Sequence, residues 1–160
     1  MKTTIRQAEK TDIKALETLI QHVLQDSNSK DYPEKVIDFM CGYYSELTIR
    51  QNFGKKITWI LEEVSFDEDE QEDVIIPKGT ISLCGNEIQA LFIDTKTQGK
   101  GYGKQLLAVA ENHAARAGID ILNLSASLTA KIFYEKMGYM HVELVDDEDF
   151  GQAYLMVKKL

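Results

Sequence analysis

Hydrophobic side chains recur at helical spacing in the first third of the chain. The first set, with members three or four residues apart, is Ile13, Leu16, Leu19, Ile20, Val23 and Leu24. It predicts an amphipathic helix with Thr11 as its N-cap. The second set is Val36, Met40, Tyr43 and Leu47, and it predicts a helix over residues 34–51. A short strand over residues 3–7 comes before both helices.

Segments typical of strands fill the middle of the chain. The three candidates are residues 56–64, 74–83 and 87–93. Because short links join them in succession, we expect an antiparallel meander. The link between the first two includes residues 62–73, which hold eight acidic residues and no basic one. Such a charge run predicts a solvated hairpin tip, although it could also attract a basic partner.

The pattern changes after residue 93. A glycine-rich turn over residues 98–103 leads into a predicted helix that ends near Ala117, just before Gly118. The apolar residues 119–124 then predict a strand, and a strand–helix–strand unit of this size requires parallel pairing. Ser127 is expected to cap a short helix that runs to about residue 137. Strands over residues 139–145 and 152–159 follow.

Together these elements predict an α/β fold of the mixed α+β kind. Its centre is a mixed, mostly antiparallel sheet of about seven strands with one parallel pair, flanked by four helices. The buried stripe of the long third helix consists of Leu106, Leu107, Ala110 and Ala114. A chain of 160 residues without internal repeats fits a single domain over residues 1–160.

Composition and charge narrow the function classes. The net charge is −8, but without residues 62–73 the 26 acidic residues fall to 18, which equals the number of basic residues. No cluster of Lys and Arg is left to bind phosphates, so we expect no nucleic-acid partner. No apolar run approaches the length of a membrane span, so we expect no membrane partner. With two well-separated cysteines and no apolar leader, a cytoplasmic protein is the simplest expectation.

The glycine-rich turn carries the clearest chemistry. Its glycines occupy alternate positions where a strand ends and a helix begins. Exposed backbone N–H groups and the helix dipole favour an anion there, and Lys100 and Lys104 add positive charge, so the turn predicts a pyrophosphate site. A tight turn that merely tolerates glycine is the alternative. A P-loop is excluded because Gln105 follows Lys104, and the spacing G-x-G-x-G does not fit a dinucleotide fingerprint.

Two motifs in this order resemble the GNAT superfamily of N-acetyltransferases. Gln98-Gly99-Lys100-Gly101-Tyr102-Gly103 matches the family pattern Gln/Arg-x-x-Gly-x-Gly/Ala between a strand and a helix. The segment from Ala130 to Tyr139 matches a second pattern, Ala-x-x-Phe-Tyr-x-x-x-Gly-Phe/Tyr. The resemblance is strong over residues 87–140. It implies a GNAT-like fold and acetyl-CoA as the cofactor.

The resemblance also implies which residues form the site. The implied cofactor-binding residues are Leu91, Phe92, Ile93, Gln98, Gly99, Lys100, Gly101, Tyr102, Gly103, Lys104, Ser127 and Lys131. Many family members have Asn at the position of Ser127, so a helix cap is the alternative role for this serine. The implied acid is Tyr134, near the sulfur, and the implied base is Glu87, which lies eleven residues before Gln98. The alternative for Tyr134 is a core aromatic without a catalytic role, and the alternative for Glu87 is an ordinary surface carboxylate.

Acetyl transfer to an amine requires a base for the amine and a donor for the carbonyl oxygen. The N–H of Phe92 or Ile93 is the expected oxyanion donor. Strand alternation would place Glu87, Gln89, Leu91 and Ile93 on one face. Neither cysteine lies in the motif region, so direct attack is expected.

The acceptor is predicted only as a class, the primary amine of a small molecule. Eight acidic residues in the expected acceptor region could attract a cationic amine or simply be a solvated rim: Asp26, Asp31, Asp38, Glu46, Asp146, Asp147, Glu148 and Asp149. Protein or peptide acetylation and a non-catalytic acyl-CoA-binding module are the alternatives. A homodimer is the assembly that we consider first, since dimers are the commonest oligomers.

Overall fold

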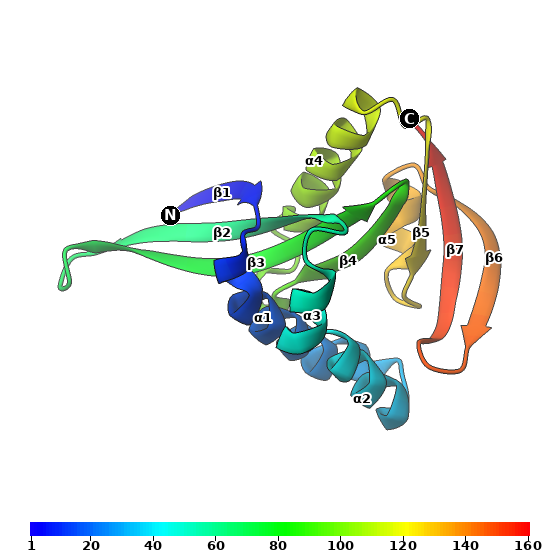
Figure 1. Cartoon of the computed structure of the whole chain (residues 1–160), viewed down its shortest axis with the longest axis horizontal. Coiled ribbons are helices and arrows are strands. Elements are labelled where there is room, and N and C mark those ends of the chain that lie inside the picture. Colours follow the sequence, from blue (N-terminus) through cyan, green and yellow to red (C-terminus); the bar gives the residue numbers. More distant parts are fainter.

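A seven-stranded sheet forms the centre of the computed structural model, which describes residues 1–160 (Figure 1). Its spatial order is β1-β2-β3-β4-β5-β7-β6. The strands are β1 Lys2–Gln7, β2 Ile57–Asp67, β3 Glu72–Cys84, β4 Glu87–Ile93, β5 Ile121–Ala126, β6 Met140–Asp147 and β7 Gly151–Lys159. All neighbours pair antiparallel except β4 and β5, which pair parallel. The predicted mixed sheet with one parallel pair is therefore confirmed.

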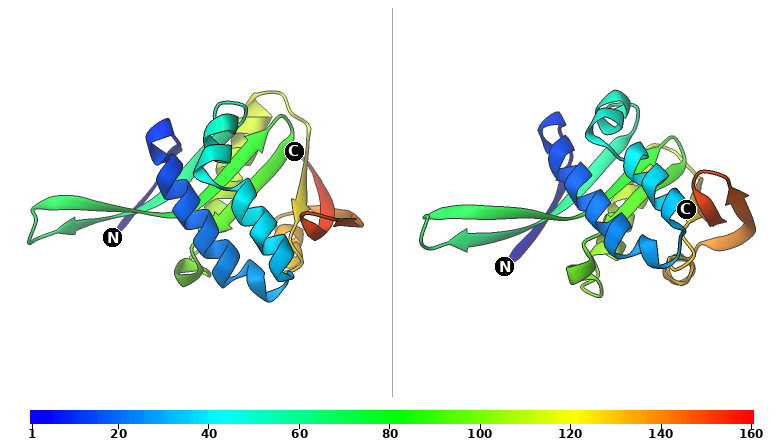
Figure 2. Two further views of the ribbon diagram at one scale, coloured as in Figure 1. Left: turned by 60° about the horizontal axis from the view of Figure 1, so that its bottom comes forward. Right: turned by 90° about the horizontal axis from the view of Figure 1, so that it is seen from below.

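Helices cover both faces of this sheet (Figure 2). They are α1 Ile13–Asp26, α2 Glu34–Tyr43, α3 Glu46–Asn52, α4 Tyr102–Arg116 and α5 Lys131–Lys136. The first three lie on one face, whereas α4 packs on the other (Figure 1). No helix combines the length and the apolar composition needed to cross a bilayer.

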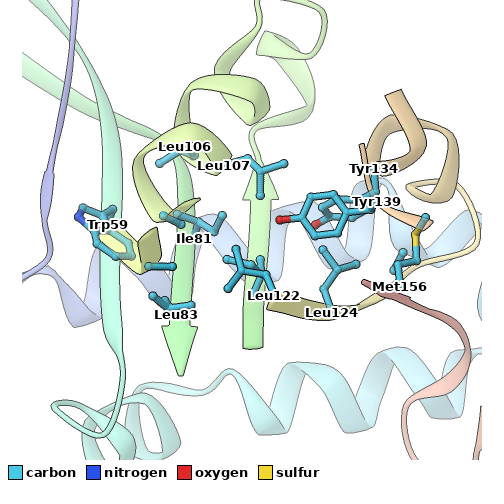
Figure 3. Close-up of a cluster of buried hydrophobic side chains, with 14 of the residues drawn as sticks. Trp59, Ile81, Leu83, Leu106, Leu107, Leu122, Leu124, Tyr134, Tyr139 and Met156 are labelled. Carbon is cyan, nitrogen blue, oxygen red and sulfur yellow. The ribbon is translucent and has the colours of Figure 1, made fainter. Parts of the chain in front are cut away.

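The main core lies between α4 and the sheet (Figure 3). The predicted stripe of α4 is buried there, with Leu106 and Ala110 fully inaccessible. Against it pack alternate residues of the central strands, among them Leu61, Ile81 and Leu122. The opposite face of these strands carries smaller and more polar side chains, including the buried Thr80 and Ser82. This difference leaves room for a pocket beneath α1–α3.

Five α-helices replace the predicted four because the helix expected over residues 34–51 is two helices. Ser45 leaves the helical conformation, with φ −74° and ψ 157°, and its side chain accepts a hydrogen bond from the Thr48 N–H. This capped break lets α3 turn away from α2.

Two predicted caps are wrong. Thr11 lies inside a short 3₁₀ turn, Lys10–Asp12, and the capping box belongs to Glu9, whose N–H donates to the Asp12 carboxylate at 2.7 Å. Ser127 lies four residues before α5 begins, and its carbonyl accepts from the Ala130 N–H at 3.1 Å. Its side chain therefore does not cap the helix.

The acidic segment is only partly the solvated tip that its charge predicts. Strands β2 and β3 continue through most of it and form a two-stranded arm that projects from the sheet (Figure 1). At the base of the arm, Glu62 and Glu63 are buried. Each is paired, Glu62 with Arg6 at 2.7 Å and Glu63 with Lys100 at 3.0 Å. For these two glutamates the prediction is wrong, because distant segments supply partners that a local charge run does not reveal.

Candidate active site

The parallel strands β4 and β5 separate almost as soon as they meet. The parallel pairing consists of two residue pairs, Glu87 with Asn123 and Ile88 with Leu124. Beyond these pairs, β5 is bonded to β7 on its other side and no longer to β4. Figure 1 shows the two strands diverging toward the carboxyl end of β4. The edge of β4 from residue 89 onward is thus left without a strand partner. A row of main-chain groups is available there to pair with an extended ligand.

A β-bulge at Ala90 accompanies this divergence. Between the pairs Ser82–Gln89 and Thr80–Phe92, two residues of β4 oppose one residue of β3. Ala90 has φ +52°, a left-handed conformation that is costly for a residue with a side chain. Bulges bend a strand and re-aim its side chains, and they are frequent beside active sites.

The bulge overturns the expectation that four residues of this strand share one face. Leu91 and Ile93 pack into the core beneath α4. Gln89 lies on the opposite face, where its Oε1 accepts from Lys56 Nζ at 3.4 Å. Phe92 also lies on that face, edge-on to Tyr44 with ring centroids 5.2 Å apart. The extra residue in the bulge shifts the alternation of side chains. Glu87 and Gln89 therefore lie on one face of the sheet, and Leu91 and Ile93 lie on the other.

The direction of the free amides follows from one hydrogen bond. Asp94 donates its N–H to the Lys78 carbonyl of β3 at 2.8 Å. Because successive amides of a strand point to opposite edges, the Phe92 N–H also faces β3 and the Ile93 N–H faces the gap toward β5. Of the two expected oxyanion donors, the geometry favours Ile93.

The glycine-rich turn presents a set of unused amides at the start of α4. Gly99 and Gly101 have φ +86° and +81°, and a Cβ at either position would meet nothing within 4 Å. The space beside them is therefore open, and the backbone conformation is one that only glycine adopts freely. The amides that donate to no protein group are those of Gln98, Gly99, Gly101, Tyr102, Gly103 and Lys104.

The two sequence motifs touch at Gly103. A Cβ placed there would lie 3.3 Å from Cζ of Phe133, which belongs to α5. The absence of a side chain thus lets the ring rest against the first turn of α4. The same α5 segment carries Tyr134 as the next residue, so this contact positions the phenol relative to the turn.

Two residues of the turn are tied to the buried Glu63. Tyr102 donates its hydroxyl to Glu63 Oε1 at 2.5 Å, and Lys100 Nζ lies 3.0 Å from the same oxygen. The hydrogen bond from Tyr102, followed by that from Lys100, lowers the pKa of Glu63, and the carboxylate raises the pKa of Tyr102 to about 12. Sequence reasoning missed Glu63 because it sits within a charge run. Lys104, in contrast, is exposed and unpaired.

Tyr134 is buried, with 6% of its surface exposed, and its ring packs edge-on against Phe133. On its other side it packs edge-on against Tyr139 (Figure 3). Its hydroxyl forms no hydrogen bond within the protein. No fully inaccessible polar side-chain atom lacks a partner, so this hydroxyl must reach an opening. A phenol is ordinarily protonated at neutral pH, and burial raises the pKa of Tyr134 further.

Glu87 is half-buried, and its carboxylate forms no hydrogen bond or ion pair. Burial, followed by the charges of Tyr43, Glu87 and Tyr134, raises the pKa of Tyr44. Tyr44 therefore lies within electrostatic reach of both predicted catalytic residues. Sequence reasoning gave Tyr44 no role in the site.

A small cavity of about 40 Å³ adjoins the bulge, between α1, α3 and the sheet. Its lining residues are Leu16, Ile20, Tyr43, Tyr44, Thr48, Ile49, Asn52, Lys56, Thr58, Thr80, Ser82 and Ala90. None of the eight acidic residues expected to face the acceptor is among them. Lys56 is the one charged residue of the lining, and nothing in its sequence context singled it out.

Two other predicted cofactor residues lie on the α5 side of the gap. Lys131 pairs with Glu135 at 3.4 Å, and its ammonium lies 4.7 Å from the centre of the Tyr154 ring. Ser127 is half-buried and its hydroxyl has no protein partner. Contact of either residue with a cofactor stays a prediction.

Comparison with known families gives one match that covers most of the chain. Residues 50–160 match the family described as Acetyltransferase (GNAT) domain. Among curated proteins, the chain is 32% identical over 97 residues to peptidyl-lysine N-acetyltransferase YjaB of Salmonella typhimurium. That alignment covers 55% of each protein, so the chain spans about half the length of this relative.

Solved structures share the whole fold at low sequence identity. A GCN5-related N-acetyltransferase from Rhodopseudomonas palustris superposes with a TM-score of 0.85 at 19% identity, covering 100% of this chain and 97% of the other. The PaiA N-acetyltransferase from Thermoplasma acidophilum, solved in complex with coenzyme A, gives a TM-score of 0.75 at 20% identity and covers all of both chains.

Proposed function

Because the chain belongs to the GNAT family of acetyltransferases, we propose that it transfers the acetyl group of acetyl-CoA to the primary amine of a small molecule by direct attack. The observation that carries this proposal is the divergence of β4 from β5 at the Ala90 bulge. It brings a free strand edge, an unpartnered tyrosine hydroxyl and the glycine-rich turn to one side of the sheet.

The turn fits the pyrophosphate of the cofactor. Its unused amides lie at the N-terminus of α4, where the helix dipole adds positive potential, and no side chain fills the space beside Gly99 and Gly101. Lys104 would add charge from the first turn of the helix. We assign Glu63 the task of holding Lys100 and Tyr102, and with them the backbone of the turn, in place.

The free edge of β4 fits the extended arm of the cofactor. Leu91 and Ile93 would pair with it through main-chain groups, as an added strand would. The Ile93 N–H, which faces this free edge, would donate to the thioester carbonyl oxygen and stabilise the negative charge that develops there during attack.

Glu87 and Tyr134 supply the two proton transfers. Glu87 lies on the pocket face of β4 with an unpaired carboxylate, so it can take a proton from the acceptor ammonium, directly or through water. The Tyr134 hydroxyl has no protein partner and, like an ordinary phenol, is protonated at neutral pH, and burial raises its pKa further. It can therefore donate to the departing thiolate. The acceptor would enter through the cavity beside Ala90, which lies on the same face of the sheet as Glu87.

Two features bear on the acceptor and the location. The small size of the cavity, about 40 Å³, favours a small molecule. The match to a peptidyl-lysine acetyltransferase favours a protein lysine as the second candidate. We place the enzyme in the cytoplasm, since Cys41 and Cys84 are both free thiols.

A thiol-release assay with acetyl-CoA and a panel of amines tests the proposal. The panel should contain amino acids, amino sugars, polyamines and lysine peptides. We expect release that depends on a small amine and mass-spectrometric detection of its N-acetyl product. Acetylation confined to lysine peptides would transfer the conclusion to the second candidate. Coenzyme A binding without turnover of any amine would instead indicate a non-catalytic acyl-CoA-binding module.

A further inference from the structure

Lys56 is unusual among the lysines of this chain. Four lysines are half-buried, and three of them have a carboxylate partner. Lys78 pairs with Asp94 at 2.8 Å, Lys131 with Glu135 at 3.4 Å and Lys158 with Glu111 at 3.0 Å. Lys56 has no carboxylate within 4.0 Å, and its one hydrogen bond, to Gln89, is long at 3.4 Å. Since a buried charge is costly unless it is paired, the missing anion calls for an explanation.

The cavity that Lys56 lines offers hydrogen-bond donors and lacks a charge of opposite sign. Thr58 and Ser82 bond to each other at 2.8 Å, and Thr80 donates to the Trp59 carbonyl. Asn52 donates to the Thr48 carbonyl and accepts from Lys55. The lining donors without a protein acceptor are one hydroxyl of the Thr58–Ser82 pair, one N–H of Asn52, the hydroxyls of Tyr43 and Tyr44 and the remaining N–H groups of Lys56, and only Lys56 is charged. Such a set suits an anionic group with two acceptor oxygens.

Glu87 lies across the sheet from Lys56. Ile57 pairs with Leu83, so Lys56 lies opposite Cys84 of β3. Cys84 in turn pairs with Glu87 of β4, so one strand lies between Lys56 and Glu87. Two strand spacings, roughly 10 Å, separate the two backbones, and both side chains lie on the pocket face. One face of the sheet thus carries an unpaired cation and an unpaired anion that do not reach each other.

This arrangement is complementary to a zwitterion. We propose that the acceptor is an amine that also carries a carboxylate, an amino acid or a close analogue, and that Lys56 binds this carboxylate while Glu87 faces the amine. The proposal rests on the acetyltransferase function argued above and names its substrate class. It narrows the predicted primary amine to one that carries a carboxylate, since the eight acidic residues that could attract a purely cationic amine do not line the cavity.

The test compares each of the twenty amino acids with its carboxamide in the thiol-release assay. For the best substrate we expect kcat/KM to favour the acid over the amide by roughly 10- to 100-fold, the value of a charge-assisted hydrogen bond. In Lys56→Met this preference should vanish, mainly through a higher KM for the acid. Lys55→Met, a change at the exposed neighbouring lysine, is the matched control and should keep the preference.

Binding and stability give readouts that do not depend on turnover. By calorimetry, the amino acid should bind to the coenzyme-A-saturated protein and lose this binding in Lys56→Met. The same variant should melt at an equal or higher temperature, since it removes an unpaired half-buried charge. Equal rates with acid and amide, faster acetylation of spermidine, or an unchanged preference in Lys56→Met would overturn the proposal. Amino-acid binding that depends on Lys56 without any turnover would leave the charge assignment intact and refute the transferase function.

Discussion

Tyr134 and Tyr139 offer a pair of matched perturbations, because the two phenols stack on each other with ring centroids 5.6 Å apart but differ in their hydrogen bonds. Both are buried, at 6% and 3% exposure. The Tyr139 hydroxyl donates to Glu111 at 3.0 Å, whereas the Tyr134 hydroxyl has no protein partner. Replacing each by Phe removes one oxygen and nothing else. The proposed acid role therefore predicts opposite effects of the two changes.

For Tyr134→Phe we expect a large loss of rate at unchanged stability. A general acid contributes roughly 10²- to 10⁴-fold, so kcat should fall by about that factor. No intramolecular hydrogen bond is lost, so the melting temperature should stay within about 2 °C of the parent or rise. The dissociation constant for coenzyme A should not change. Burial raises the pKa of this phenol above the ordinary value of about 10, so the loss should be constant from about pH 6 to 9.

For Tyr139→Phe the pattern should reverse. A hydrogen bond to a charged group contributes about 1.5–3 kcal/mol, but Glu111 keeps its ion pair with Lys158, so a loss near 1–1.5 kcal/mol is expected. In a domain of this size that lowers the melting temperature by about 2–6 °C. Thermal melts and steady-state kinetics on both variants check the pair. Equal activity in Tyr134→Phe and the parent would refute the acid role. Equal losses of rate in both variants would mean that the stack acts as a unit.

Three further changes test other parts of the site. Glu87→Gln should lower kcat by roughly 10²- to 10⁴-fold without changing coenzyme A affinity, and an unaltered rate would exclude Glu87 as the base. Glu63→Gln should cost about 1–2 kcal/mol by weakening the bond from Tyr102. The pKa of Glu63 is lowered in the folded state, so its contribution is present above the ordinary carboxyl pKa of about 4.3 and is lost as the pH falls below it. Urea titrations from about pH 7 to 3 should thus show a shallower acid limb in Glu63→Gln, and parallel limbs would contradict this. Ser45→Ala should destabilise the protein by about 0.5–2 kcal/mol through the lost cap of α3, and an unchanged urea midpoint would argue against that cap.

Much of the fold follows from local patterns. The period of apolar residues predicts α1 and α4, and the order strand, glycine turn, helix, strand predicts the parallel pair. The break between α2 and α3 carried a signal too, since Ser45 is a preferred N-cap type followed by an acidic first turn. Apolar residues at helical spacing continue past Ser45, from residue 36 to residue 47, and this pattern predicts one helix in place of two.

Other parts depend on contacts between distant segments. Ala90 carries no signal for a positive φ, so neither the bulge nor the face reversal after Gln89 could be predicted. Glu63 belongs to a charge run, and only folding brings it to Lys100 and Tyr102, 37 and 39 residues away. Nothing in the sequence distinguishes Lys56 from the other lysines, because its lack of a carboxylate partner is a property of the folded structure. Motifs therefore predict the cofactor side of the site better than the acceptor side.

The central claim concerns the turn that precedes α4, and the helix itself supplies a control. Gly101 and Gly118 lie at its two ends with φ +81° and +80°, and a Cβ at either would meet nothing within 4 Å. Valine at either position therefore imposes similar backbone strain, of about 1–2 kcal/mol. Only Gly101→Val adds a side chain beside the unused amides.

Titration calorimetry of coenzyme A into the parent and both variants is the most direct measurement. We expect Gly118→Val to bind like the parent and Gly101→Val to lose at least roughly tenfold in affinity, or about 1.4 kcal/mol. Equal affinity in all three proteins would contradict the claim that these backbone amides hold the pyrophosphate.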